Sequence, residues 1–141
     1  MEKDKTPQSP EKLLPAQKGS FLERRIKSFG FAFKGLGLFI RTQPNGWVHL
    51  TAAVLVCSLG AWLGLSVGEW LMIILCIGGV LSAEVLNTAV EFLTDLVSPG
   101  FHPKAGQVKD LAAAGVLLMA ITSVVVGGVI FIPKIIRLIM N

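Results

Sequence analysis

Three apolar segments, each long enough to cross a lipid bilayer, constrain this sequence more than any other feature. They run from Trp47 to Val67, from about residue 70 to Val97, and from Leu111 to Ile132. A helix needs roughly 20 residues to cross about 30 Å of hydrocarbon, and each segment reaches that length. Because 52% of the 141 residues are hydrophobic and they gather in these runs, a membrane protein is favoured over a soluble domain. We predict an all-α integral membrane protein with three transmembrane helices.

The region before the first span divides into two parts. Residues 1–19 contain three prolines and alternating charges, which predicts a disordered tail. In residues 20–42, large apolar side chains such as Phe29 and Phe33 recur at helical spacing, while the charged residues fall mostly elsewhere on the wheel. This pattern predicts an amphipathic helix on the inner membrane surface, within a single membrane domain of residues 20–141. A cleaved signal peptide is not expected in so polar a segment.

Positive charge predicts the orientation. Nine of the thirteen Lys and Arg residues precede the first span, and Lys104 and Lys109 lie between the second and third spans. Under the positive-inside rule, the N-terminus and the 98–110 loop face the cytoplasm, although Lys134 and Arg137 then lie outside. Basic residues beside a span interact with anionic lipid, so the net charge of +4 requires no nucleic-acid partner.

The second span carries polar residues at positions that share one helix face. Glu84, Asn87, Glu91 and Asp95 are three, four and four residues apart, so they form a stripe. Carboxylates are costly in hydrocarbon, and in a span they mark a pathway, a reaction centre or a helix seam. Measured from Leu71, Glu84 lies roughly 20 Å along the span and Glu91 roughly 30 Å. The stripe therefore leads from the inner leaflet to the cytosol.

This geometry suits a reaction between a lipid head group and a soluble reactant. Glu84 is deep and desolvated, which makes it a candidate general base. Glu91 is shallower and is a candidate ligand for a divalent cation that clamps phosphate oxygens. In the loop SPGFHPKAGQVKD, Ser98 to Asp110, lysines stand where they would neutralise a nucleotide, and Asp110 is expected to begin the third helix as an N-cap or to contact ribose or metal.

These residues also have simpler interpretations. Glu84 and Glu91 can be protonated carboxyls in an oligomer seam, and Asn87 can join helices there. Asp95 is favoured as a solvated helix-end residue, and His49 as an interfacial polar residue. Lys109 fits a membrane anchor as well as a phosphate contact. The isolated Cys57 and Cys76 fit packing roles. The phosphate-loop motif is missing, because GFHPKAGQ has the wrong glycine spacing and lacks the GK pair. The HRD and DFG motifs of protein kinases are missing as well.

A longer pattern resembles a known family. The run E-V-L-N-T-A-V-E-x-x-x-D from Glu84 to Asp95, followed by H-P and V-K-D-L-A-A-A-G, is similar to the signature of the bacterial membrane diacylglycerol kinase and undecaprenol kinase family. The resemblance extends over about residues 24–133, with R-x-x-x-S-F-x-x-A-x-x-G near its start and I-F-I-P-K at its end. It implies a homotrimer of three-span subunits, each with a surface helix, in the bacterial inner membrane. The implied reaction is phosphorylation of a lipid hydroxyl with MgATP at a subunit boundary.

The resemblance also implies roles for individual residues. Glu84 matches the base that contacts the lipid, and Glu91 matches a ligand of Mg²⁺. ATP contacts are implied for Phe31, Glu91, Gly100, Phe101, His102, Lys109 and Asp110, and substrate contacts for Arg24, Ser28, Glu84 and Asn87. One branch of the family has a second metal-binding glutamate where this chain has His49, so His49 is the second candidate ligand. The undecaprenol kinase branch has E-x-N-x-x-x-H where this chain has Gln43 in place of the glutamate.

Several functions follow as hypotheses. The His49 pattern, the AAAG after Asp110 and the I-F-I-P-K end favour undecaprenol as acceptor, with diacylglycerol, which gives phosphatidic acid, as the alternative. A hypothesis of another class is a non-enzymatic membrane subunit or cation conduit that uses the same acidic face. Three spans offer too little surface to enclose a polar stripe, and Gly78, Gly79 and the small residues from Ala112 to Gly115 favour self-association. The residues alone predict an oligomer, and the resemblance makes it a trimer.

Overall fold

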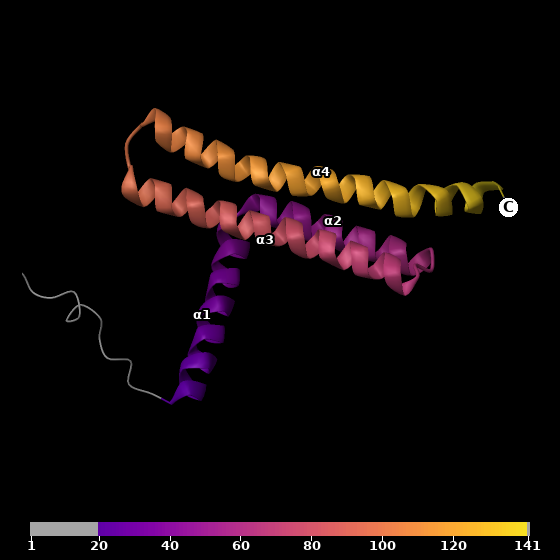
Figure 1. Cartoon of the computed structure of the whole chain (residues 1–141), viewed down its shortest axis with the longest axis horizontal. Coiled ribbons are helices and arrows are strands. Elements are labelled where there is room, and N and C mark those ends of the chain that lie inside the picture. Colours follow the sequence, from indigo (N-terminus) through magenta and orange to yellow (C-terminus); the bar gives the residue numbers. More distant parts are fainter. Residues whose placement is uncertain (1–19, 141) are drawn as a thin grey trace, which may run out of the picture. The chain divides into compact units, whose positions relative to one another are not determined.

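The structure is a computed structural model that describes residues 20–140. The predicted tail, residues 1–19, lies outside the described residues. The chain forms four helices, α1 (Phe21–Thr42), α2 (Pro44–Trp62), α3 (Val67–Val97) and α4 (Pro103–Met140) (Figure 1). Residues 20–140 contain no β-strand, so the predicted all-α class is confirmed for this part of the chain.

The chain divides into two units, the first ending at Lys34 and the second beginning at Gly35. The described part of the first unit is Ser20 and the earlier part of α1, and the backbone N–H of Ser20 donates to the Glu23 carboxylate at 3.0 Å. The Arg25 guanidinium lies 5.0 Å from the centroid of the Phe21 ring. The predicted helix over residues 20–42 is therefore present, and its place on the membrane surface stays a prediction.

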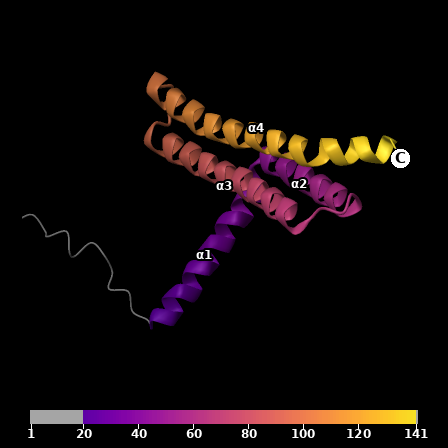
Figure 2. The same cartoon turned by 45° about the vertical axis from the view of Figure 1, so that its right-hand side comes forward.

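The second unit is built around an antiparallel hairpin of α3 and α4, which lie side by side in both views (Figures 1 and 2). The helix α2 packs against α3 less extensively. The core lies where the first half of α3 meets the second half of α4, around the buried residues Leu65, Ile73 and Phe131. The polar stripe of α3 lies in the other half of the helix, towards the loop at residues 98–102.

The connection between α2 and α3 is set by local sequence. The helix α2 ends at Trp62, before the predicted end at Val67, because Gly64 turns the chain at a φ of 64° that suits glycine. The helix α3 then starts at Val67 with a capping box, in which Ser66 Oγ accepts from the Glu69 N–H and the Glu69 carboxylate accepts from the Ser66 N–H at 2.6 Å. Lys134 of α4 lies 3.2 Å from the same carboxylate, which joins α4 to this end of α3.

The predicted loop over residues 98–110 is wrong in its second half. The helix α4 begins at Pro103, so Asp110 lies within the helix and is not its N-cap. Proline suits a first helical turn, since its fixed φ is already helical and the missing N–H would have no helical partner there. Most residues from Lys104 to Lys109 are compatible with a helix, and Gly106 alone weakens it. The connecting loop is therefore shorter than predicted.

Two of the three predicted spans meet the requirements of length and composition. These are α3, with 31 residues, and α4, with 38 residues, which continues past Pro133. Few residues in the apolar stretches of α3 and α4 are buried within the chain, as expected for helices that face lipid or another subunit. The helix α2, which corresponds to the first predicted span, begins with the polar sequence Pro44-Asn45-Gly46 and does not meet the same requirements, so the first span stays a prediction.

Candidate active site

The buried polar residues of the described chain gather at the Glu84 end of the α3 stripe. Glu84 is 4% exposed, Asn87 8% and Thr88 6%, whereas every other side chain that is buried in residues 20–140 is apolar or glycine. Burial removes these groups from water, which is unfavourable unless they find polar partners. Thr88 follows Asn87 in the sequence, and its burial adds a second polar group between Glu84 and Glu91.

Glu84 contacts His49 of the neighbouring helix. His49 Nε2 on α2 lies 2.9 Å from Glu84 Oε1 on α3, and the side chain of Glu84 is 5% exposed against 24% for His49. The sequence indicates His49 as a candidate metal ligand and Glu84 as a candidate base, but it does not predict that the two side chains are in contact. This contact joins the two helices at the level of the buried carboxylate.

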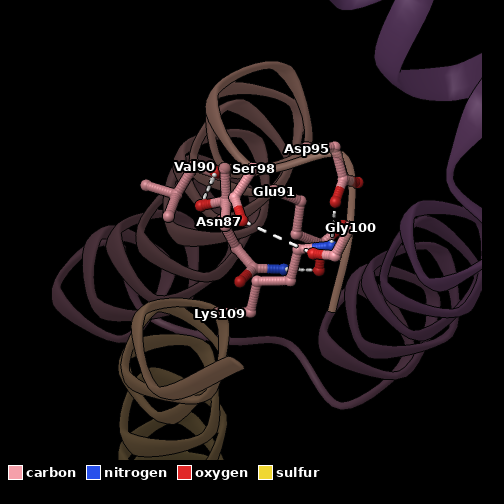
Figure 3. Close-up of polar contacts among 8 residues, drawn as sticks. Asn87, Val90, Glu91, Asp95, Ser98, Gly100 and Lys109 are labelled. Carbon is pink, nitrogen blue, oxygen red and sulfur yellow. Dashed lines mark hydrogen bonds and ion pairs between the residues drawn. The ribbon is translucent and has the colours of Figure 1, made fainter. Parts of the chain in front are cut away.

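One turn further along α3, Asn87 orients Glu91. Asn87 Nδ2 donates a hydrogen bond to Glu91 Oε1 at 2.9 Å (Figure 3). Two neighbouring buried atoms, Asn87 Oδ1 and Thr88 Oγ1, have no hydrogen-bond partner among residues 20–140. Unpaired buried oxygens are uncommon in folded proteins, so each indicates a missing donor, cation, water or subunit contact.

The stripe ends in an ion pair near the loop. Lys109 Nζ on α4 donates to Asp95 Oδ1 on α3 (Figure 3). Asp95 was predicted to be a solvated helix-end residue, and its side chain is indeed 63% exposed. The structure adds that Asp95 is the partner of the lysine predicted to contact phosphate, a pairing that needs the hairpin geometry to be seen.

The remaining predicted nucleotide residues of the second unit lie at the same end of the hairpin. Gly100, Phe101 and His102 form the loop, and Phe101 is 98% exposed. The backbone N–H of Lys104 donates to His102 Nδ1 at 3.2 Å, which orients the imidazole. Asp110 is exposed on α4, next to Lys109 in the sequence.

Three predicted residues belong to the first unit and are described by themselves. Ser28 Oγ donates to the carbonyl oxygen of Arg24 at 2.9 Å, so this hydroxyl is held against its own helix. The Lys34 ammonium lies 5.8 Å from the centroid of the Phe31 ring. These residues are exposed within the described chain.

No group of three or more His, Cys, Asp and Glu side chains within residues 20–140 is arranged to hold a metal ion. The structure brings His49 to Glu84 and Asn87 to Glu91, so the two predicted metal ligands contact different partners. Their role as ligands stays a prediction.

An apolar cavity of about 370 Å³ opens between α2, α3 and α4. His49 contributes to its lining, together with small residues such as Ala52 and Gly127 and larger ones such as Ile73 and Phe131. The cavity is therefore largely apolar, and it is lined in part by His49, which contacts Glu84.

With this arrangement known, comparison with known proteins identifies the family. The family described as prokaryotic diacylglycerol kinase matches residues 30–131, which include the whole α3 stripe, the loop and most of α4. The chain belongs to this family. The predicted family is confirmed, and two long apolar helices agree with membership of a prokaryotic membrane kinase family.

Three relatives show how the similarity is distributed within the diacylglycerol kinase family. An undecaprenol kinase of Bacillus subtilis (strain 168) is 42% identical over 113 residues, covering 80% of this chain and 92% of the relative. A diacylglycerol kinase of Synechocystis sp. is 35% identical over 114 residues, covering 80% of this chain and 65% of the relative. A diacylglycerol kinase of Escherichia coli (strain K12) is 30% identical over 102 residues, covering 72% and 84%.

Proposed function

We propose that this protein is a membrane lipid kinase that transfers the γ-phosphate of ATP to a primary lipid hydroxyl, with undecaprenol as the preferred acceptor. The observation that carries the proposal is the burial of Glu84 in an apolar helix, at the inner end of a polar stripe. The higher identity to a relative named undecaprenol kinase supports this acceptor over diacylglycerol. Diacylglycerol remains the alternative acceptor.

In this proposal Glu84 is the general base. The lipid hydroxyl loses its proton to the Glu84 carboxylate as its oxygen attacks the γ-phosphorus, and ADP leaves with the electron pair of the broken bond. Phosphoryl transfer of this kind depends mostly on positioning and charge neutralisation. The Glu84 carboxylate is buried and contacts His49 of α2, so it meets the requirement for positioning.

The residues around Glu91 fit Mg²⁺. Glu91 presents a carboxylate oriented by Asn87, and Asn87 Oδ1 is a buried amide oxygen without a partner among residues 20–140. Carboxylate and amide oxygens, together with phosphates of the substrate, are the ligands that Mg²⁺ prefers. When bound, Mg²⁺ supplies charge neutralisation for the phosphate oxygens.

The nucleotide end is proposed to lie at the hairpin loop. Lys109 offsets the charge of the phosphates, and Gly100, Phe101, His102 and Asp110 contact the rest of the nucleotide. The largely exposed state of this end supports access from water. Phe31 of the first unit is proposed as a further ATP contact.

The acceptor end is proposed to lie at the apolar cavity. The lining of the cavity is largely apolar and includes His49, the partner of Glu84. The hydrocarbon chain of a lipid bound in the cavity would therefore bring the hydroxyl of that lipid close to the proposed base. Asn87 is proposed to contact the substrate from α3. Arg24 and Ser28 are proposed to contact the acceptor from the surface helix.

The wider arrangement belongs to the same proposal. We expect three spans in the bacterial inner membrane, with α2 as the first, the N-terminus in the cytoplasm and three copies in each assembly. The buried unpaired oxygens of Asn87 and Thr88 support a further subunit or ligand at the stripe. The distribution of Lys and Arg supports the orientation.

The test is transfer of labelled γ-phosphate from MgATP, by purified protein in mixed micelles, to undecaprenol and diacylglycerol in parallel. The proposal expects labelled undecaprenyl phosphate as the dominant product. Dominant phosphatidic acid would replace undecaprenol by the alternative acceptor. If neither lipid is labelled while the protein is folded, the kinase proposal fails for both acceptors, and a conduit through the acidic face becomes the hypothesis to test.

A further inference from the structure

We propose that His49 is a positioning residue for Glu84, donating a hydrogen bond from Nε2 to Oε1 that leaves Glu84 Oε2 to receive the proton of the acceptor. The inference rests on the proposed function, since it assigns a role in the same proton transfer. It also gives His49 a different task from the metal binding predicted for it.

The geometry supports a bond between these two side chains. The distance of 2.9 Å is that of a normal hydrogen bond, and the two residues are 35 positions apart on different helices. Glu84 is almost fully buried, so it needs a polar partner, and within residues 20–140 its side-chain partner is His49. A buried carboxylate in contact with one fixed donor has fewer orientations available to it.

The direction of the hydrogen bond follows from the proposed chemistry. A base must be ionised before it accepts a proton, and an ionised carboxylate only accepts hydrogen bonds. His49 must then present Nε2–H, because Nε2 is the atom next to Glu84 Oε1. Oε1 accepts this bond, whereas Oε2 accepts no hydrogen bond from a side chain of residues 20–140, so Oε2 is the oxygen assigned to take the proton from the lipid hydroxyl.

The same contact argues against His49 as a ligand of Mg²⁺. Its Nε2 is committed to Glu84, and Mg²⁺ prefers oxygen ligands over imidazole nitrogen. Glu91, the other predicted ligand, is bonded to Asn87 one turn further along the stripe. The metal is therefore expected near Glu91, and His49 acts on the base.

The kinetic test compares two substitutions of His49 with the wild type. His49→Gln keeps an N–H donor at similar reach, whereas His49→Leu keeps apolar bulk and removes the donor. Ser58→Ala is the matched control on α2, because Ser58 is exposed and, within residues 20–140, its hydroxyl donates to the carbonyl oxygen of Val54 of the same helix. Initial rates are measured with the full chain in mixed micelles, as functions of lipid acceptor, MgATP and free Mg²⁺.

The expected result is a split between kcat and KM. His49→Leu should lower kcat by about 10- to 100-fold, the range seen when residues that orient metal ligands are replaced, while both KM values and the Mg²⁺ dependence stay within about twofold. His49→Gln should recover most of kcat, and Ser58→Ala should match the wild type. An unchanged kcat in His49→Leu, or a higher Mg²⁺ requirement in both His49 variants, would overturn the inference.

A spectroscopic measurement separates the contact from the proposed function. The chain has two histidines, so protein labelled with ¹⁵N-histidine gives few signals, and His102→Gln assigns them. In Glu84→Gln the Nε2 signal of His49 should shift while that of His102 stays in place. If the His49 signal is the same in Glu84→Gln and wild type, the inference is overturned whatever lipid is phosphorylated. If the signal differs between the two proteins but the wild type phosphorylates no lipid, the failure lies in the proposed function.

Discussion

Lys109 of α4 donates its hydrogen bond to Asp95 of α3, so the cation proposed to bind phosphate already has an anionic partner within the hairpin. Both side chains retain contact with solvent, at 37% and 63% exposure. An exposed ion pair contributes little to stability, typically below about 1 kcal/mol. Its importance is therefore expected in nucleotide binding, where the phosphates of ATP compete with Asp95 for the same ammonium.

Asp95→Asn tests this competition. Removing the negative charge leaves Lys109 more available, so the KM for MgATP should fall about two- to threefold at low salt, with the difference reduced at high salt because ions screen exposed charges. Thermal unfolding should change little. A higher KM for MgATP in this variant would instead show that Asp95 itself helps to bind the nucleotide or its metal.

Glu84→Gln tests the proposed base. The amide has nearly the shape of the carboxylate but does not accept the proton, so kcat should fall by about 10²- to 10⁴-fold. MgATP should still raise the unfolding temperature, since nucleotide binding to the native state stabilises it by mass action. Turnover near that of the wild type would rule out Glu84 as the base.

Glu91→Gln tests the metal site. The neutral amide is a weaker ligand for Mg²⁺, so the Mg²⁺ concentration that gives half the maximal rate should rise about tenfold or more. Asn87→Ala removes the hydrogen bond that orients Glu91 and should act in the same direction with a smaller effect. Rates measured against free Mg²⁺ at fixed ATP provide the comparison. The same Mg²⁺ dependence in Glu91→Gln and wild type would contradict the assignment.

Ser66→Ala tests the opposite end of the hairpin. The loss of the N-cap of α3 should lower the free energy of unfolding by about 1 kcal/mol. Because the cap lies at the far end of α3 from Asp95, kcat and both KM values should match the wild type once the protein is folded. A drop in kcat with an unchanged unfolding temperature would contradict a purely structural role.

The sequence predicted the parts of the site that depend on spacing along one helix. The separations from Glu84 to Asp95 are enough to place four side chains on one face, because helix geometry is regular. The family resemblance rested on the same residues and is confirmed by the match over residues 30–131. The helix at residues 21–42 was also visible as an apolar periodicity.

Contacts between helices were not predictable in the same way. Periodicity does not determine how α2 is rotated against α3, so the contact of His49 with Glu84 could not be deduced from the spacing of either residue. The pair of Lys109 and Asp95 depends on the start of α4 at Pro103, which the loop predicted over residues 98–110 places too late in the sequence. The capping box of Ser66 and Glu69 was present as S-V-G-E and would have placed the start of α3 at Val67.

The length of α4 links this protein to the thickness of its membrane. Its 38 residues extend about 57 Å, nearly twice the hydrocarbon thickness of about 30 Å. The apolar part of α4, residues 111–132, matches the hydrocarbon core, and this apolar length, not the length of the whole helix, sets the fit to the bilayer. The turns before Leu111 are polar, so we expect them to extend past the hydrocarbon into water. The excess length of α4 would then act as a rigid spacer that holds Lys109 at a fixed height above the lipid surface.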